Sequence, residues 1–283
     1  MPERLRLAEA TMNVPPKPET ADAPLLRADV DGVALLSLNR PKAANTLSEA
    51  TLAALASNFS DIAKDKSVRA VILSASGPAF CAGHDMKEMT ARRSDKDGGR
   101  AYIKDLMQRC SAVMQSIMRL PQPVIAAVEG VATAAGCQLV ATCDLAVASQ
   151  AARFATPGVH IGLFCSTPMV ALSRNVGAKH AMEMLLTGDM VSADDAYRIG
   201  LVNRVVPPGK AQEAAMAFAR KVASKSALVL KTGKEAFYRQ RDMSVSEAYD
   251  YAVGVMVENM MFRDAEEGIG AFIEKREPRW EDR

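Results

Sequence analysis

The sequence predicts an α/β fold in which helices cover a largely parallel β-sheet and a helical region completes the chain. Two observations support this fold class. Short apolar runs that suit buried strands alternate with longer stretches of helical periodicity over residues 25–200. From about Thr167 onward the apolar residues recur almost only at helical spacing. Strands that alternate with helices form βαβ units, whose strands run parallel.

Local signals place the individual strands and helices. Four runs rich in Val, Ile, Leu and Ala are predicted strands, at residues 33–38, 70–74, 123–128 and 145–149. A helix over 48–64 begins after Ser48, whose hydroxyl suits an N-cap, and another helix covers 101–119. The polar residues 88–99 are predicted to form a flexible surface segment. Further helices are predicted at 178–186, 192–199, 209–224, 228–240 and 244–261.

Three regions divide the chain. Residues 1–24 are rich in proline and lack any apolar period, which predicts a disordered N-terminal tail. Residues 25–200 form the predicted α/β core, built from repeated βαβ units. Residues 201–283 form the predicted helical C-terminal region.

The charge balance argues against some classes of partner. The 283 residues include 35 Lys and Arg and 33 Asp and Glu, which gives a formal net charge of +2. This balance predicts neither nucleic acid nor an anionic membrane as a partner. No apolar run has transmembrane length, and the first residues match neither a signal peptide nor a transit peptide. The sequence therefore predicts a cytoplasmic protein.

The cysteines give no sign of a metal or redox site. Five are present and they form no Cys-x-x-Cys pair: Cys81, Cys110, Cys137, Cys143 and Cys165. We therefore expect small, buried, reduced thiols and no bound metal.

Two loops of small residues are candidates for a site that stabilises negative charge. They read Cys81-Ala82-Gly83-His84-Asp85 and Thr133-Ala134-Ala135-Gly136, and the second opens a predicted helix. Small residues let the backbone approach a ligand closely, and amides at a helix N-terminus favour negative charge. Preorganised amides of this kind stabilise a carbonyl oxygen that gains charge during a reaction. The alternative is that both loops are only tight turns between strands and helices.

Together with flanking residues, these loops resemble the crotonase family of enoyl-CoA hydratases and isomerases. The resemblance is carried by 80–88, by 123–144 and by 154–158, and it extends over about 33–279. It implies the crotonase (ClpP-like) fold and an acyl-CoA thioester as ligand, with no permanently bound cofactor and no metal. It also implies an oxyanion hole made by the backbone N–H groups of His84 and Ala135. Members usually have glycine at the second position, and the alanine here keeps the amide.

The resemblance further implies contacts to coenzyme A and self-association. Phosphates of coenzyme A favour nearby lysines, although each such lysine could also be a solvated surface charge. Through the helical region 201–283 the family forms trimers, so a homotrimer or a dimer of trimers is expected. The implied positions for coenzyme A are Lys42, Ala44, Ala82, Asp85, Met86, Lys87 and Lys275.

Two positions depart from the family pattern. The hydratases have glutamates where this chain has Gln138 and Gly158, and these glutamates activate and deliver a water. A carboxamide can orient a water but exchanges no proton near neutral pH, and glycine offers no side chain. A positioned acid or base contributes about 10²–10⁴-fold to the rate, so weak or absent hydration is expected. The sequence around both positions resembles a branch of the family that lacks both acids.

Several other residues are weaker candidates for the missing chemistry. Some members place an acid at the position of Ser166, which carries none. Glu88 could act as a base, and His160 could serve a Cys165 or Ser166 nucleophile. The remaining polar residues near the motifs are expected to be structural: Asp85 as a cap, Asp144 as a turn anchor and His180 on a helix.

Two alternatives to hydration therefore stay open. One is a non-catalytic acyl-CoA binding or regulatory protein, and the other is an enzyme of a different thioester reaction, such as hydrolysis. The Met-rich stretch 253–262 could line an acyl tunnel or a subunit contact, but an ordinary helix core is the favoured interpretation.

Overall fold

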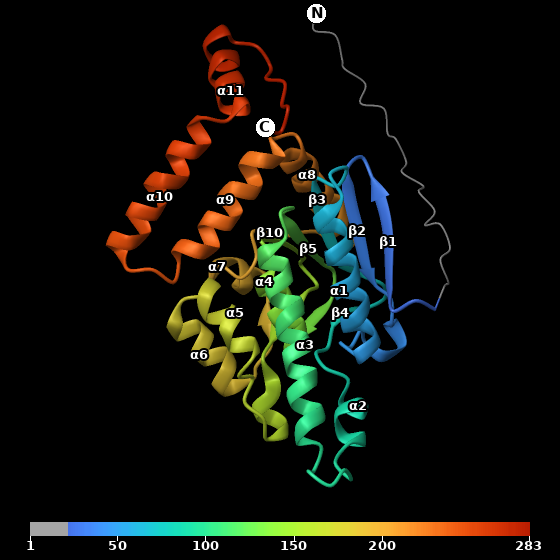
Figure 1. The fold of residues 1–283 in the computed structure, drawn as a ribbon. Helices are drawn as coiled ribbons and strands as arrows, with labels where there is room; N and C mark the ends of the chain where they lie inside the picture. Colours follow the sequence, from blue (N-terminus) through green and yellow to red (C-terminus); the bar gives the residue numbers. More distant parts are fainter. Residues whose placement is uncertain (1–21) are drawn as a thin grey trace, which may run out of the picture.

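A six-stranded sheet forms the centre of the molecule (Figure 1), as seen in a computed structural model that describes residues 22–283. The strand order is β1-β2-β3-β5-β7-β10, and every neighbouring pair is parallel except β1 with β2. The predicted parallel sheet is confirmed, whereas most of the predicted tail 1–24 lies outside the described residues. The strands are β1 (Leu25–Val30), β2 (Val33–Leu38), β3 (Ala70–Ala75), β5 (Val124–Val128), β7 (Leu145–Ser149) and β10 (Arg204–Val206).

A second, smaller sheet lies at the carboxyl ends of the large one and was not predicted from the sequence. Its order is β4-β6-β8-β9, with β9 antiparallel to β8. Along the chain, β4, β6 and β8 each follow a parallel strand of the large sheet. Each of them therefore continues from the carboxyl end of that strand toward the predicted loops. The strands are β4 (Ala79–Cys81), β6 (Val131–Thr133), β8 (Arg153–Ala155) and β9 (Val191–Ser192).

The helices follow the predicted order along the chain. The helix expected at 48–64 begins after Ser48, whose side chain accepts a hydrogen bond from the Thr51 N–H and so caps it. The polar segment 88–99 starts inside a short helix rather than as a loop, because Asp85 caps that helix. The helices are α1 (Glu49–Lys64), α2 (Met86–Ala91), α3 (Arg100–Arg119), α4 (Ala135–Thr142), α5 (Pro168–Asn175), α6 (Ala178–Thr187), α7 (Ala193–Arg198), α8 (Ala211–Ala223), α9 (Ala227–Gln240), α10 (Val245–Met260) and α11 (Arg263–Glu274).

Helices cover both faces of the large sheet. On one face α1, α3 and α4 bury residues such as Leu55, Val113 and Leu139 against the strands. On the other face α8 packs Ala215 and Met216 against the sheet. The strand β10 therefore belongs to the sheet, and α8 covers it. Both elements follow residue 200, where the predicted α/β core was expected to end and the helical region to begin. Within the described residues no helix is both long and apolar enough to cross a membrane.

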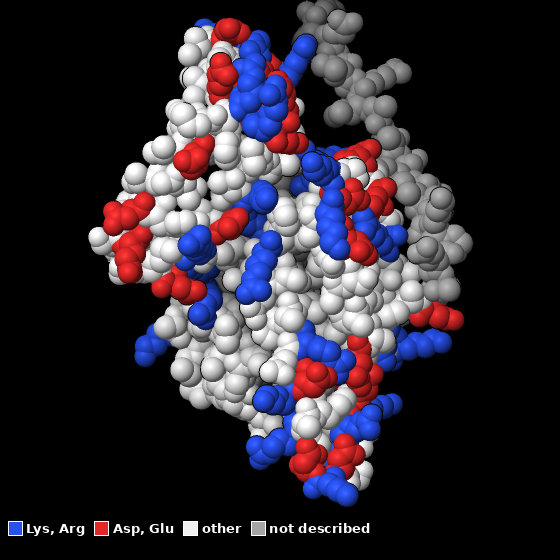
Figure 2. Space-filling view, viewed as in Figure 1, with Lys and Arg blue, Asp and Glu red and all other residues white. Residues whose placement is uncertain are grey.

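The last three helices extend away from the sheet (Figure 1) and leave much apolar surface open. No apolar residue of α9 or α10 is buried in the described chain. The Met-rich stretch 253–262 is therefore not a helix core here, and that interpretation is wrong, since Met256 is 62% exposed. Figure 2 accordingly shows few charges over α10. The exposed apolar side chains of α10 and α11 include Tyr249, Val253, Met256, Val257, Met260, Ile269, Phe272 and Ile273.

One buried ion pair fastens α9 to the core. The Lys234 Nζ donates to Asp144 Oδ2 at 2.6 Å and to the carbonyls of Ile117 and Gln122 at 2.9 and 3.0 Å. The Tyr238 hydroxyl donates to the other oxygen of Asp144 at 2.8 Å. The same carboxylate accepts the Val124 N–H, so the expected turn anchor also joins the start of β5 to α9.

We expect Lys234→Met to destabilise the protein by about 3–5 kcal/mol, because it leaves the largely buried Asp144 carboxylate without its cation. The measurement is the free energy of unfolding in urea. Lys210→Met is the matched control, because the Lys210–Glu213 pair is exposed and its loss should change little. Equal effects of the two substitutions would contradict the anchoring role.

Candidate functional site

The two predicted loops meet at the junction of β4 and the first turn of α4. A Cβ added to Gly136 would lie 2.0 Å from the Cys81 carbonyl oxygen, so only glycine permits this contact. A Cβ on Gly83 would lie 3.0 Å from the Ala134 Cβ and 3.4 Å from the Ala135 nitrogen. The hydroxyl of Thr133 also donates to the Ala82 carbonyl at 3.2 Å. The structure therefore brings the two loops together as one unit.

Two backbone amides in this unit are available to a ligand. Within residues 22–283 neither the His84 N–H nor the Ala135 N–H donates a hydrogen bond. Ala135 is the first residue of α4, where amides lack partners within the helix, and the helix dipole favours negative charge there. Ala134, just before it, has φ 50° and ψ −118°, an uncommon conformation for alanine that turns the chain from β6 into the helix.

Gln138 lies one turn further along the same helix. It is only 6% exposed, and its Oε1 has no hydrogen-bond partner among the described residues. Helical side chains lean back toward the N-terminus of their helix, so the carboxamide covers the turn that begins at Ala135. Gln138 and the Ala135 amide therefore lie close together because they belong to the same helix, one turn apart.

Gly158 lies in a 3₁₀ turn, Pro157–Ile161, and its surroundings are closed. A Cβ added there would lie 2.7 Å from the Leu163 carbonyl oxygen and 2.9 Å from the Cys165 sulfur. The Leu163 N–H in turn donates to the Gly158 carbonyl at 2.9 Å. Backbone and thiol therefore occupy the space that a side chain at this position would need.

The His84 imidazole is a second buried polar group beside these loops. Both ring nitrogens are buried, and neither has a hydrogen-bond partner among the described residues. Burial lowers the pKa of the ring, and the nearby Leu47 carbonyl offsets part of that effect. The ring is therefore neutral at pH 7, with one nitrogen that donates and one that accepts.

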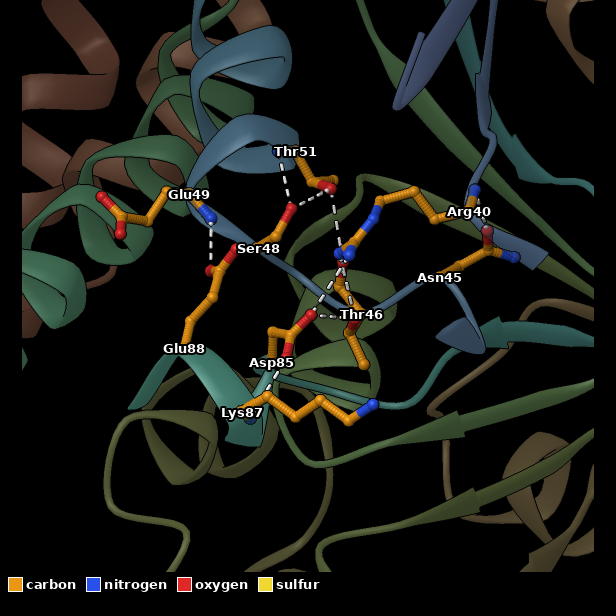
Figure 3. A network of polar contacts seen from close by, with 9 residues as sticks. All are labelled: Arg40, Asn45, Thr46, Ser48, Glu49, Thr51, Asp85, Lys87 and Glu88. Atoms are coloured by element: carbon orange, nitrogen blue, oxygen red, sulfur yellow. Dashed lines mark hydrogen bonds and ion pairs between the residues drawn. The ribbon is translucent and has the colours of Figure 1, made fainter. Parts of the chain in front are cut away.

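A polar network holds the loop of His84 in place (Figure 3). Arg40 Nη2 and the Thr46 hydroxyl both lie 3.2 Å from Asp85 Oδ2, and Asp85 Oδ1 accepts the Lys87 N–H. Burial alone would raise the pKa of Asp85, but the hydrogen bonds, with that from Arg40 foremost, outweigh it and lower the pKa. Asp85 is thus an ionised cap, as expected, and its charge is compensated by Arg40.

Backbone contacts complete this network. The Leu47 N–H donates to the Gly83 carbonyl at 2.8 Å, and the Ala82 N–H donates to the Ala44 carbonyl at 3.0 Å. The carbonyl of Ala44 is therefore used within the protein. The amide N–H that His84 presents is consequently fixed from both sides.

The residues expected to contact coenzyme A fall into two groups. Ala82, Met86, Lys87 and Lys42 are exposed on adjoining segments, and Figure 3 shows the Lys87 side chain extending away from the network. Lys275, by contrast, follows the last residue of α11, and Figure 1 shows α11 and α2 at opposite ends of the molecule. One chain therefore does not bring Lys275 to the other six positions.

The weaker candidates for acid, base or nucleophile have other contacts. Glu88 Oε2 accepts the Glu49 N–H at 2.9 Å and so caps α1. The His160 Nε2 lies 2.8 Å from the Thr187 carbonyl, at the end of α6. Burial raises the pKa of the Cys165 thiol, which makes it a poor nucleophile. Ser166 is exposed and bonds only to the Phe164 carbonyl within the described chain.

Two supporting residues were missed by the sequence analysis. Arg40 compensates Asp85, and the buried Asn45 donates to the carbonyls of Ser76 and Ala79 at 2.8 and 2.7 Å. Asn45 also has φ 52°, a conformation that asparagine tolerates better than most residues. The sequence signal for this role was the position of Asn45 in a predicted loop, directly after two alanines.

Comparison with known proteins defines the class. The sequence model of the enoyl-CoA hydratase/isomerase family matches residues 29–283, which is most of the chain. Together with the fold and the paired amides, this shows that the chain belongs to the enoyl-CoA hydratase/isomerase family, the crotonases.

Within the family, the chain is similar to enoyl-CoA hydratase domain-containing protein 3. The human mitochondrial protein is 47% identical over 262 residues, 93% of this chain and 85% of its own length. Its crystal structure superposes with a TM-score of 0.86 at 48% identity and covers 91% of this chain and 100% of that one. An enoyl-CoA hydratase structure from Mycobacterium smegmatis is 56% identical, with a TM-score of 0.87 over 91% of this chain and 98% of its own. The branch indicated by the sequence around Gln138 and Gly158 is thus confirmed.

The same comparison corrects one prediction. The rat, human and mouse relatives are all mitochondrial proteins by name. This finding contradicts the prediction of a cytoplasmic protein, which relied on the charge pattern of the first residues.

We expect Gly136→Ala to destabilise the protein by about 3 kcal/mol or more, because the new methyl group overlaps the Cys81 carbonyl and must force β4 and α4 apart. Thermal or urea unfolding measures this. Gly233→Ala, on the open side of α9, is the control and should be neutral or stabilising by about 0.5–1 kcal/mol. A stable Gly136→Ala protein would disprove the close approach.

We expect His84 to make stability depend on pH. Its folded-state pKa is lowered, whereas the unfolded chain binds a proton near pH 6.5. The stability that the neutral ring provides is therefore present above about pH 6.5 and is lost as pH falls toward the lower folded pKa. His84→Asn should lose less stability than the wild type between pH 7.5 and 5. His180→Asn, at an exposed site, should behave as the wild type, and identical slopes for all three proteins would contradict the assignment.

Proposed function

We propose that this protein binds an acyl-CoA thioester and polarises its carbonyl with the His84 and Ala135 amides. The supporting observation is that neither N–H group has a hydrogen-bond partner in the described part of the chain, and both belong to loops that touch through Gly83 and Gly136. Amides that are already oriented lose no free energy on reorganisation when charge develops on the bound oxygen. Family membership supports the thioester as ligand.

We further propose that hydration is weak or absent. The Gln138 carboxamide cannot act as an acid or a base near neutral pH, and the space beside Gly158 is filled by Leu163 and Cys165. No other carboxylate replaces them among the candidates, because Glu88 caps α1 and Asp85 pairs with Arg40. A role in binding, or a reaction that needs only a polarised thioester, is therefore favoured over water addition.

The coenzyme A contacts are proposed to come from two subunits. Lys42 and Lys87 lie on the loops beside the amides and would approach the phosphates as cations. Lys275 would come from α11 of a neighbouring copy, because within one chain it lies far from α2. The exposed apolar faces of α10 and α11 support a homotrimer or a dimer of trimers, since a lone chain would leave them in water.

Hydrolysis by a side-chain nucleophile is less well supported. The buried Cys165 thiol has a raised pKa, and His160 contacts the end of α6 instead. A non-catalytic acyl-CoA binding protein therefore remains the alternative to an enzyme of a different thioester reaction.

The decisive experiment combines calorimetric binding with an assay of crotonyl-CoA hydration. We expect crotonyl-CoA to bind, and hydration to stay below about 0.1 per second, about 10²-fold under a typical enzyme rate. Hydration at about 10 per second or above would refute the proposed loss of activity.

A matched pair of variants tests the coenzyme A contact. Lys87→Ala should weaken crotonyl-CoA binding about tenfold, because one charged phosphate contact is lost. Binding of crotonyl-pantetheine, which lacks those phosphates, should not change. Lys96→Ala, on the exposed segment after α2, is the control. An equal loss for both esters would place Lys87 elsewhere than at the phosphates.

A further inference from the structure

A cavity of about 650 Å³ lies between the end of α3 and α9, away from the two free amides. Its volume falls within the range of roughly 300–1,000 Å³ that is typical of small-molecule sites. Figure 1 shows α2, which begins next to Lys87, near the start of α3. From there α3 extends over 20 residues, about 30 Å at 1.5 Å per residue, before it reaches the cavity. The cavity is therefore separate from the positions proposed for coenzyme A.

The two walls of the cavity are held in place by the buried ion pair that fastens α9. Lys234 donates to Asp144 and to a carbonyl in the last turn of α3, so it joins one wall to the other. Tyr238 lines the cavity, and its hydroxyl donates to Asp144, which fixes the direction of the ring. Together with Leu120 and Pro121, this ring gives the cavity an apolar wall. Such a cavity is formed before any ligand arrives, as most small-molecule sites are.

Three cations line the cavity without an acidic partner. Arg119 donates to the side-chain oxygen of Gln115 at 2.8 Å, which is a neutral acceptor. Arg239 lies over the ring of Tyr251, with 4.7 Å between its guanidinium carbon and the ring centre. Lys231 has no side-chain partner among residues 22–283. The positive charge of these three side chains is therefore available to a ligand.

Two acids also line the cavity, and they offset these cations only in part. Asp242 lies 3.9 Å from Arg174, so its charge is already compensated by a cation outside the cavity lining. Glu235 stands four residues after Lys231 and four before Arg239, yet it pairs with neither in the described chain. Figure 2 shows Lys and Arg side chains over α9 and the adjoining end of α3, together with acidic ones. Positive charge thus exceeds negative charge around the cavity.

These features select one class of ligand. A phosphate monoester carries close to two negative charges at pH 7, and its oxygens accept hydrogen bonds from several Lys and Arg side chains at once. A carboxylate or a sulfate ester carries only one charge, which is less than the unpaired cations can compensate. The wall of Tyr238, Leu120 and Pro121 favours a flat or apolar body on the same molecule.

We propose that the cavity between α3 and α9 binds a small phosphate monoester with a flat, apolar body, whose phosphate contacts Arg119, Lys231 and Arg239. This ligand is additional to the acyl-CoA thioester and does not reach the reacting carbonyl. Because α9 leads into α10 and α11, a ligand that bridges α3 and α9 also holds the start of the C-terminal helices against the core. The site therefore suits an effector rather than a substrate.

The test is calorimetric binding of three probes to the whole protein. Phenyl phosphate should bind at least about tenfold more tightly than phenyl sulfate, which has the same shape but one charge. It should exceed inorganic phosphate by a similar factor, because that ion lacks the ring. Lys231→Met and Arg119→Met should each weaken phenyl phosphate binding about tenfold. Lys221→Met, at an exposed lysine of α8, is the matched control and should bind as the wild type.

Competition distinguishes this site from that of the thioester. Saturating crotonyl-CoA should leave the affinity for phenyl phosphate unchanged, because the two sites lie near opposite ends of α3. Displacement of phenyl phosphate by crotonyl-CoA would overturn the inference, and so would equal affinities for phenyl phosphate and phenyl sulfate. Normal binding by both Lys231→Met and Arg119→Met, or no binding by the wild type, would also overturn it. None of these results affects the proposed thioester binding, which crotonyl-CoA alone tests.

Discussion

The geometry of the site depends on one close backbone contact, between the end of β4 and the first turn of α4. Gly136 faces the Cys81 carbonyl so closely that a Cβ would lie 2.0 Å from its oxygen, and a Cβ on Gly130 would lie 1.9 Å from the Pro78 carbonyl oxygen. Gly136 lets α4 lie against the end of β4, and Gly130 lets the segment before β6 lie against the segment before β4. The separation of the His84 and Ala135 amides is set by that contact, and so is the position of Gln138 one turn later.

Two kinds of support give the two ends of the molecule different rigidity. Around the amides, hydrogen bonds between loops leave little freedom: Arg40 and Thr46 hold Asp85, and Asn45 bridges two carbonyls. Preorganisation of this kind is what a charge-stabilising site needs. The C-terminal helices have no comparable core, and α9 meets the sheet chiefly through Lys234 and Tyr238 on Asp144.

Much of the fold followed from the sequence because its signals are local. Apolar periodicity located α1 and α3, Ser48 marked a helix start, and small residues marked the two loops that meet. Periodicity reports which face of a helix is apolar but not what covers it, so the exposure of α10 could not be predicted. Contacts between distant residues were equally hidden: Lys234 with Asp144, Glu88 with the Glu49 amide, and the segment that fills the space beside Gly158. Each of these depends on folded proximity rather than on spacing along the chain.

The closed surroundings of Gly158 make the two positions unequal for anyone who wishes to build a carboxylate into this site. A glutamate at Gly158 would require the Leu163 carbonyl and the Cys165 side chain to move together, because both lie within 3 Å of the place a Cβ would take in the 3₁₀ turn. A glutamate at Gln138 requires no such rearrangement, because a side chain of the same length is already present there. One position therefore accepts a change of chemistry alone, while the other accepts it only with a new path of the backbone.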